Sequence, residues 1–390
     1  MIPRPSFCLA LGCTAMLLAG CASARPAMTG DALHQHVTRA MAENAAIVSA
    51  LERSFQERLQ DDLAAGRRPT IDILALSGGA DWGAYGAGFL LAWSQKPVDD
   101  PLAMPDFDLV TGISTGSLIA PYAALGRYAE IESLFRHSTP DWARSRFLSS
   151  AFSGEGLYDI SLLEDAIYAN LDRTVIPGLC DPTRPRRNVL IATADVDLGF
   201  LRVWDAAALA RDRDRFRAVQ RAAIAIPAAF DPVFVDGTLQ ADAGVLMQLI
   251  AVAQPDRISG YMRAWNQAHP GSPMRLRYWV IANNRTAEPP TTVQPTWHAL
   301  FARSTAMMMK SGVLAPLTTL WLQSELLRRE GLDVEFRWTA IPSSFPIDPA
   351  IPPFDPRITG ALADLGRSLG AQADAWRTVP PSPITRPDQP

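Results

Sequence analysis

The stretch 107-FDLVTGISTGSLIAPYAAL-125 decides the fold class of this chain. Its first part, 107–111, has the large and β-branched residues of a short strand, and 117–125 is typical of a helix. Between them lies a G-x-S-x-G pattern formed by Gly112, Ser114 and Gly116. In a nucleophile elbow the serine occupies a tight turn between strand and helix, where small flanking residues let the backbones approach. The pattern predicts such an elbow, with an ordinary glycine-serine connection as the alternative.

Strand and helix patterns alternate on both sides of this stretch. Further strands are predicted at 71–76, 188–194, 275–282 and 334–340. Helices are predicted at 31–66, 84–93, 129–137, 161–171, 211–224, 256–268, 297–329 and 356–376. Strands separated by helices favour a mainly parallel α/β sheet that is covered on both faces.

Composition and charge exclude several classes of protein. The chain has 390 residues, of which 48% are hydrophobic, so it can bury a large core. Its formal net charge of −4 provides no basic surface for nucleic acid, and no nucleic-acid partner is expected. The chain shows neither a His/Cys cluster with zinc spacing nor a calcium-loop pattern, so no metal or cofactor is expected.

The N-terminus has the pattern of a secretory signal. Arg4 precedes a short apolar segment, 7–18, and the sequence 18-LAGC-21 follows it. This ending resembles a bacterial lipobox, in which Cys21 would carry lipid and become the first mature residue. A plain signal peptide cut near Ala22 or Ala24 is the alternative. The apolar run 311–322 is shorter than the roughly 20 residues that a membrane span needs, and it is expected to be a core helix.

The remaining cysteines leave no disulfide within the mature chain. Cys8 and Cys13 would be removed with the signal, and Cys180 would then have no partner. Cys180 is therefore expected to be a structural or surface thiol.

A glycine-rich loop, 77-SGGADWGAYGAG-88, follows the strand at 71–76. No lysine follows Gly83, which excludes a Walker loop, and no register gives the dinucleotide pattern G-x-G-x-x-G. The remaining explanation is a loop whose backbone N–H groups point at a developing oxyanion, helped by the N-terminus of the next helix. Gly86 and Gly88 are better explained by close helix packing.

A serine nucleophile needs a base, and the sequence offers an aspartate rather than a histidine. None of the five histidines lies in a context that marks it as catalytic. In the segment 225–244, Asp236 and Gly237 predict a hairpin turn, and Asp242 follows the second strand of that hairpin. On local grounds, Asp242 is equally consistent with a helix cap.

Together, the glycine loop, the elbow and the segment around Asp242 resemble the patatin-like phospholipases in their bacterial form. The resemblance spans about 70–250, with looser similarity at 279–283 and 354–356. It implies a three-layer α/β/α fold with a mainly parallel central sheet. It also implies a lipid acyl hydrolase that acts on phospholipid or another lipid ester without a cofactor.

The resemblance further assigns roles to individual residues. Ser114 would attack the ester carbonyl and form an acyl-serine, and Asp242 would accept the serine proton and later activate water. Backbone amides of Gly78, Gly79 and Ala80 would hold the oxyanion. Since an exposed aspartate has a pKa of about 3.9, such a base would depend on its placement in an enclosed site.

Three positions depart from the family pattern. Ala80 replaces the third glycine of the loop, Trp82 replaces the Arg or Asn before the last glycine, and Ala243 replaces the glycine after the aspartate. Alanine resists positive φ, which glycine accepts freely, so these changes bear on loop geometry and rate.

Two other functions remain open from the sequence. One is a catalytically degenerate lipoprotein that only binds lipid, and the other is an esterase whose Ser-Asp-His triad uses His269 or His298. The lipobox predicts anchoring in a bacterial envelope membrane, and we expect the outer membrane, facing the periplasm or the surface.

The chain is expected to divide into a signal and three further parts. These are a lipoprotein signal (1–20), an N-terminal linker and helix (21–69), the patatin-like domain with its helical C-terminal part (70–378) and a disordered Pro-rich tail (379–390).

Overall fold

A computed structural model of the chain describes residues 25–146, 156–183, 187–250, 255–287, 290–346, 348, 351–372 and 374–381. The predicted signal, Cys21 and most of the predicted tail therefore lie outside the described residues. None of the described helices is long and apolar enough to cross a lipid bilayer.

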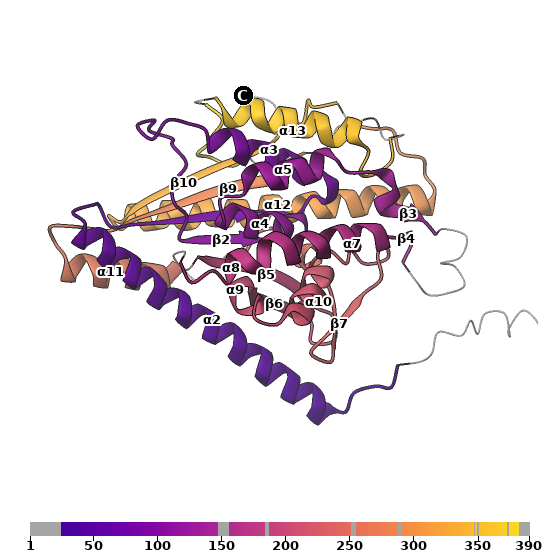
Figure 1. Ribbon diagram of the computed structural model, residues 1–390, viewed down its shortest axis with the longest axis horizontal. Helices are drawn as coiled ribbons and strands as arrows, with labels where there is room; N and C mark the ends of the chain where they lie inside the picture. The colour runs from indigo at the N-terminus through magenta and orange to yellow at the C-terminus, as the bar shows by residue number, and fades with distance from the viewer. Residues whose placement is uncertain are drawn as a thin grey trace, which may run out of the picture.

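The centre of the molecule is a mixed sheet whose main part is parallel (Figure 1). The strand order is β10-β9-β1-β2-β5-β8-β7, and β6 pairs with β5. The parallel strands are β1 (Thr70–Leu76), β2 (Leu109–Gly112), β5 (Asn188–Asp195), β9 (Arg275–Arg285) and β10 (Asp333–Ile341). The antiparallel strands are β6 (Phe200–Asp205), β7 (Val233–Val235) and β8 (Thr238–Asp242). A separate two-stranded ribbon is formed by β3 (Arg144–Ser145) and β4 (Tyr158–Asp159).

Helices cover both faces of this sheet, which confirms the predicted three-layer α/β/α fold. One face is covered by α3 (Gly83–Trp93), α4 (Thr115–Ala124), α5 (Tyr128–Arg136), α9 (Ala206–Leu209), α10 (Arg213–Ala223) and α13 (Pro356–Gly370). The other face is covered by α2 (Gly30–Ala64), α11 (Pro255–Ala268) and α12 (Trp297–Arg329).

Shorter helical elements connect the layers at the edges of the sheet. They are the 3-10 turns η1 (Ala80–Trp82), η2 (Pro140–Ala143) and η4 (Ala243–Val245), helix α7 (Ser161–Asn170), the π-helical turn η3 (Leu171–Val175) and helix α8 (Ile176–Leu179).

The sheet is apolar because most of its strands are buried on both faces. Six of the seven β1 residues are buried, and so are all residues of β2 and β5. Burial on both faces requires continuous apolar runs, which is the pattern that these strands show in the sequence. Each of the two helical layers packs against the sheet through its own buried cluster. These two clusters hold the strand ends, and therefore the loops that follow them, in fixed positions.

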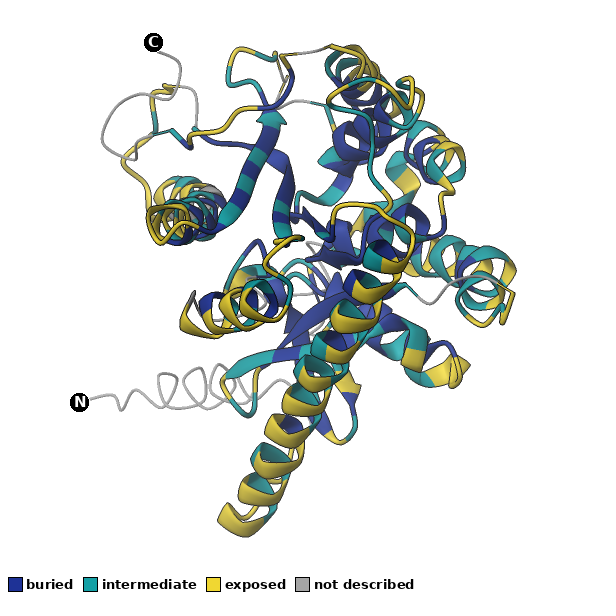
Figure 2. Cartoon of the chain, turned by 90° about the vertical axis from the view of Figure 1, so that its left-hand side faces the viewer, coloured by how far each residue is buried: buried dark blue, intermediate teal, exposed yellow. Residues whose placement is uncertain are grey.

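Helix α2 packs along one side of the molecule and extends beyond its body (Figure 2). Thr29 caps it by accepting the Ala32 N–H, and Gly66, at φ +67°, follows its end. Leu51 and Leu59 are buried against the sheet, whereas most of the helix surface is exposed. The helix thus packs along the sheet through one apolar stripe and leaves its other faces exposed.

Three details differ from the predicted elements. Strand β6 was not predicted, because its residues carry no uniform apolar run and alternate between half-buried and buried. The strand expected from Phe107 begins at Leu109, and the helix expected to reach Trp376 ends at Gly370. Trp376 instead joins an aromatic cluster with Trp93 and Trp279, which explains its apolar surroundings outside a helix.

Candidate active site

Ser114 lies at the carboxyl end of β2, in the turn that leads into α4. Its backbone is in the left-handed region, at φ 52° and ψ −123°, which a residue other than glycine rarely adopts. The turn is closed by the Ser117 N–H, which donates to the Ser114 carbonyl oxygen at 2.8 Å. This strained turn is the geometry of a nucleophile elbow, with the side chain projecting at the sheet edge.

The two glycines of the elbow lie where a side chain would collide with backbone. A Cβ added at Gly112 would come within 2.1 Å of the Gly116 carbonyl oxygen. One added at Gly116 would come within 2.4 Å of the carbonyl oxygen of Leu76 on β1. Both glycines are therefore required for the close approach of α4 to strands β1 and β2.

A chain of hydrogen bonds supports the elbow from the side of α10. The Gln220 side-chain amide donates to Ser117 Oγ at 3.0 Å, and Ser117 Oγ donates to the Ser114 carbonyl oxygen at 2.6 Å. All three residues are buried. The Ser114 carbonyl oxygen thereby accepts hydrogen bonds from both the N–H and the Oγ of Ser117.

Asp242 lies at the end of β8, which pairs with the last three residues of β5 beyond the end of β2. This placement directs β8 back toward the elbow, and the Asp242 carboxylate lies near enough to the Ser114 hydroxyl for that hydroxyl to act on the pKa of the carboxyl. Its Oδ1 also accepts the Gly244 N–H at 2.7 Å, so Asp242 caps η4 as well. Asp242 therefore both caps the helical turn, as the sequence suggested, and lies beside Ser114.

Burial changes the acidity of Asp242. The side chain is almost completely removed from solvent, and this desolvation raises its pKa to about 6. The Ser114 hydroxyl and the hydrogen bond from the Gly244 N–H both lower this pKa, but they are smaller influences than burial. A carboxylate with this pKa is a stronger base than an exposed one and is still largely ionised at neutral pH.

The glycine loop after β1 packs directly against Ser114. A Cβ at Gly78 would come within 3.0 Å of Ser114 Cβ, and one at Gly79 would come within 2.0 Å of the Asn283 carbonyl oxygen. Among the described residues, no protein acceptor is found for the N–H groups of Gly78, Gly79 and Ala80. Three such donors beside a serine hydroxyl provide the hydrogen-bonding capacity of an oxyanion hole.

Asn283, at the carboxyl end of β9, fixes this loop. Its backbone N–H donates to Ser77 Oγ at 2.8 Å, and its side-chain amide donates to the Ser77 carbonyl oxygen at 2.9 Å. Ser77 Oγ in turn donates to the Gly78 carbonyl oxygen at 2.8 Å. The sequence shows loose family similarity at 279–283 but assigns Asn283 no role, because these hydrogen bonds depend on β9 lying next to β1.

The three departures from the family pattern have different structural consequences. Ala80 has φ 51°, so it adopts the conformation that alanine disfavours. Ala243 does not have a positive φ, so it fits within η4 without backbone strain. Trp82 lies under the Arg285 guanidinium, whose central carbon is 5.5 Å from the ring centroid. Strain from the substitutions is thus confined to Ala80.

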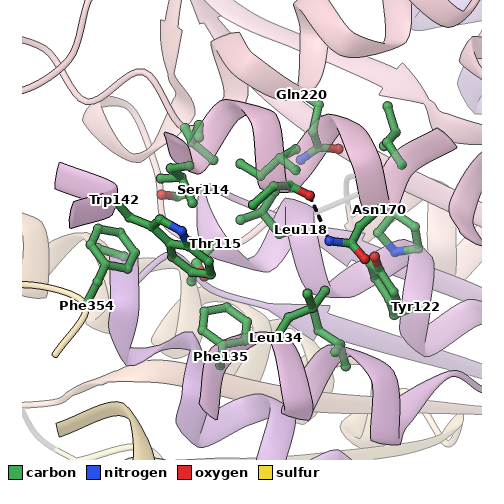
Figure 3. Close-up of a pocket in the computed structure, with 18 of the residues that line it drawn as sticks. Ser114, Thr115, Leu118, Tyr122, Leu134, Phe135, Trp142, Asn170, Gln220 and Phe354 are labelled. Carbon is green, nitrogen blue, oxygen red and sulfur yellow. Dashed lines mark hydrogen bonds between the residues drawn. The ribbon is translucent and has the colours of Figure 1, made fainter. Parts of the chain in front are cut away.

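An apolar pocket extends from Ser114 into the molecule (Figure 3). Its walls come from α4, α5, α7, α10 and the loops around Trp142 and Phe354, and it encloses about 840 Å³ including its open mouth. Side chains that line it include Leu118, Tyr122, Leu134, Phe135, Trp142, Leu163, Ile167, Asn170, Gln220, Phe230 and Phe354. A pocket with this lining fits a hydrocarbon chain whose carboxyl end lies at Ser114.

The pocket mouth is tied to the glycine loop. Asp81, in η1, accepts the Phe354 N–H at 3.0 Å, and burial raises the pKa of Asp81. Phe354 has φ 62° and packs edge-to-face on Trp142. This contact places an aromatic wall beside the N–H groups of the loop.

The histidines considered for a triad are not found beside Ser114. His269 stacks on the Trp265 ring, with the ring centroids 4.0 Å apart, at the end of α11. His269 comes before the first residue of β9, whereas Ser114 comes after the last residue of β2. Because these strands are parallel members of one sheet, the two residues lie at opposite ends of the strands. His298 is in the first turn of α12, and its side chain lies outside the described part of the structure.

Neither a metal site nor a disulfide is found in the described residues. No group of three or more His, Cys, Asp or Glu side chains is close enough there to hold a metal ion. Cys180 is a free, exposed cysteine.

One comparison with known proteins finds a family model that matches part of the chain. The model of the patatin-like phospholipase family matches residues 74–252, which run from β1 through the elbow to just beyond η4. No curated protein matched the chain. This match contains the glycine loop, Ser114 and Asp242, and the family acts as lipid acyl hydrolases. Residues 74–252 therefore form a patatin-like phospholipase domain.

Proposed function

We propose that this protein hydrolyses carboxylic esters of lipids with a catalytic dyad of Ser114 and Asp242. The observation that carries the proposal is the buried Asp242 carboxylate beside the Ser114 hydroxyl at the head of an apolar pocket. The acyl chain would occupy the pocket, and the ester carbonyl carbon would lie at Ser114 Oγ. The carbonyl oxygen would then face the N–H groups of Gly78, Gly79 and Ala80.

In the first half of the reaction, Ser114 Oγ attacks the carbonyl carbon as its proton passes to the Asp242 carboxylate. The resulting tetrahedral oxyanion accepts hydrogen bonds from the glycine loop. When it collapses, the ester C–O bond breaks, and the protonated Asp242 gives its proton to the departing alcohol. The products are an acyl-serine, a free alcohol and an ionised Asp242.

In the second half, water replaces the alcohol. Asp242 accepts a proton from the water as its oxygen attacks the acyl-serine carbonyl. Collapse of the second tetrahedral intermediate breaks the bond to Ser114 Oγ, which takes the proton back from Asp242. The fatty acid leaves, and the dyad returns to its starting state.

We further propose that a lipid on Cys21 anchors the protein in a bacterial envelope membrane. The sequence 18-LAGC-21 after an apolar segment supports this assignment. An outer-membrane location, facing the periplasm or the surface, would bring the site to its lipid substrate.

The proposal is tested by the release of fatty acid from a phospholipid, a lysophospholipid and a series of nitrophenyl esters. We expect the parent protein to release fatty acid and the Ser114→Ala variant to release none above background. Circular dichroism would show that both proteins are folded. A folded parent that binds these lipids without hydrolysing any of them would instead support the degenerate lipid-binding alternative.

A further inference from the structure

Six exposed apolar side chains lie at the edge of the sheet that carries the site. We call this group the catalytic-edge rim, and each member is between 48% and 66% exposed. Its members are Val196, Phe234, Val245, Leu246, Met307 and Met308. Single exposed apolar residues are common, but a group beside a lipid pocket requires an explanation.

The topology of the sheet brings these residues to one edge. Val196 directly follows β5, and its N–H donates to the Leu239 carbonyl oxygen on β8 at 2.8 Å. Val245 and Leu246 follow Asp242 by three and four residues. The rim therefore begins within the loops that carry the catalytic aspartate.

Helix α12 adds the two methionines to this edge. The Gln248 N–H donates to the Gly312 carbonyl oxygen at 3.2 Å, which attaches α12 to the segment after Asp242. Met307 and Met308 precede Gly312 by about one helical turn. Because α12 leads into the start of β10, its N-terminal half projects at the opposite, catalytic edge (Figure 1).

The chain before α2 is fixed at the same edge. Helix α2 runs antiparallel to the parallel strands. Near its C-terminal end, Arg58 pairs with Asp108, just before β2. Near its N-terminal end, the His36 ring lies 3.3 Å from the position that a Cβ on Gly237 would occupy. Further toward the N-terminus, Arg25 pairs with Asp197 at 2.7 Å, and its guanidinium carbon is 4.7 Å from the centroid of the Phe234 ring.

Residue 25 is therefore held against the rim itself. Cys21 precedes it by four residues, a length of chain that reaches at most about 14 Å. A lipid attached to Cys21 would thus enter a bilayer close to the rim.

We propose that the catalytic-edge rim is the surface through which the protein contacts a lipid bilayer. This inference rests on the proposed function and specifies how the site meets its substrate. A bilayer is the occupant because the tethered segment ends at the rim and the pocket for an acyl chain opens at the same edge. A lipid could then pass from the bilayer to Ser114 with little of its chain exposed to water.

The inference predicts a selective loss of activity toward lipid in vesicles. The test compares the full-length chain with a Phe234→Ser/Met307→Ser variant on two substrates, a soluble nitrophenyl butyrate and phosphatidylglycerol in vesicles. Both residues are outside the dyad and the pocket, so turnover of the soluble ester should stay within about two-fold. Hydrolysis of vesicle lipid should fall about ten-fold or more, because two apolar contacts with the bilayer are lost.

A matched control is provided by the other end of α12. Leu322 and Leu326 are 54% and 48% exposed, close to the values of the rim, but they lie toward the opposite edge of the sheet. The Leu322→Ser/Leu326→Ser variant should hydrolyse both substrates like the parent. Rim and control variants that lose vesicle activity equally, or that both retain it, would overturn the inference.

A second readout does not depend on catalysis. Hydrogen exchange of the full-length Ser114→Ala protein, with and without vesicles, should slow at 196–199, 243–247 and 303–309 but not at 322–329. Such protection without any hydrolysis by the parent would contradict the proposed function and leave the docking surface standing. Hydrolysis without protection would overturn the docking surface alone. A dimer in solution that the rim variant converts to a monomer would show that the rim binds a second copy instead.

Discussion

Two residues of the site, Ser114 and Ala80, hold backbone conformations that cost free energy. Their φ values are 52° and 51°, and an L-residue in this region costs about 1–2 kcal/mol relative to the right-handed region. For Ser114 the turn exposes the hydroxyl at the sheet edge. The role proposed for Ala80 uses only its N–H, which a glycine would supply without strain. The chain therefore retains the loop geometry in spite of the alanine.

Replacing Ala80 with glycine should relieve this strain without harming catalysis. We expect Ala80→Gly to keep turnover within a few-fold and to leave the free energy of unfolding no lower than that of the parent, since relief of strain offsets the added freedom of the unfolded chain. Ala92→Gly, inside α3, is a matched control that should cost about 1 kcal/mol. Thermal unfolding and ester turnover measure both effects. A loss of stability at position 80 equal to that at position 92 would contradict the assigned strain.

The raised pKa of Asp242 predicts how kcat/KM falls at low pH. Its pKa is raised to about 6, and only the ionised carboxylate can accept the Ser114 proton. As pH falls through this value, kcat/KM for a neutral ester should decrease, approaching a tenfold loss per pH unit well below it. Above it the rate should level off. A profile that stays flat down to pH 4 in folded protein would show that Asp242 is not the base.

The sequence could predict the site residues that belong to motifs but not those that act through the fold. Ser114 and Asp242 were predicted because each lies in a short pattern with a defined spacing. Asn283 and Gln220 act only because β9 lies beside β1 and α10 lies beside α4. Asn283 lies in the segment of looser family similarity, 279–283, but no local pattern assigned a role to either amide.

At the scale of elements, the pocket is built mainly from helices on one face of the sheet. Helix α4 follows Ser114, while α7 and α10 supply further walls of the pocket. Ile167 of α7 is half-buried and lines the pocket. The length of acyl chain that the site accepts should therefore depend on side-chain volume in α7.

A larger residue on α7 should shorten the accepted chain. We expect Ile167→Trp to lower turnover of nitrophenyl palmitate about ten-fold or more, because the indole occupies space needed by the distal carbons. Turnover of nitrophenyl butyrate should change by less than about three-fold. Leu322→Trp, on the exposed surface of α12, should change neither rate. Equal losses for both esters in the α7 variant would indicate damage to the dyad rather than a shorter pocket.

The sequence predicted most elements because their apolar patterns match their burial. The buried runs of β1 and β5 have the continuous apolar residues of parallel strands, and Asp236 and Gly237 form the predicted hairpin turn, with φ 51° and 87°. Strand β6 was missed because its pairing with β5, rather than its own composition, makes it a strand. Tertiary pairing is not visible in a local pattern.

At the scale of the whole molecule, the two edges of the sheet have different roles. At the amino edge, buried carboxylates pair with arginines: Asp72 Oδ2 with Arg277 at 2.8 Å and Asp108 Oδ1 with Arg58 at 3.1 Å. At the carboxyl edge lie the proposed dyad, the pocket mouth and the catalytic-edge rim. Helix α2 runs from one edge to the other, so the segment just before it, which includes Arg25, has a fixed position relative to the site.

The proposed anchor predicts where the protein is found in the cell. Cys21→Ser should abolish incorporation of labelled palmitate, because the lipidated sulfur is lost. Several acyl chains anchor a protein stably, whereas protein contacts alone give weaker attachment. The variant should therefore be released from washed membranes more readily than the parent, as measured by fractionation and immunoblotting. Unchanged palmitate incorporation would refute the lipobox.

The most direct test of the central claim is labelling of the active serine by a fluorophosphonate. The probe reacts only with an activated hydroxyl, so intact mass spectrometry should show one adduct per chain, located on the peptide that contains Ser114. Ser114→Ala should show no adduct. The nearly isosteric Asp242→Asn should react at no more than about one-hundredth of the parent rate. His269→Ala and His298→Ala should label at the parent rate. A folded histidine variant that labels as slowly as Asp242→Asn, or a parent that does not label at all, would contradict a Ser114–Asp242 dyad.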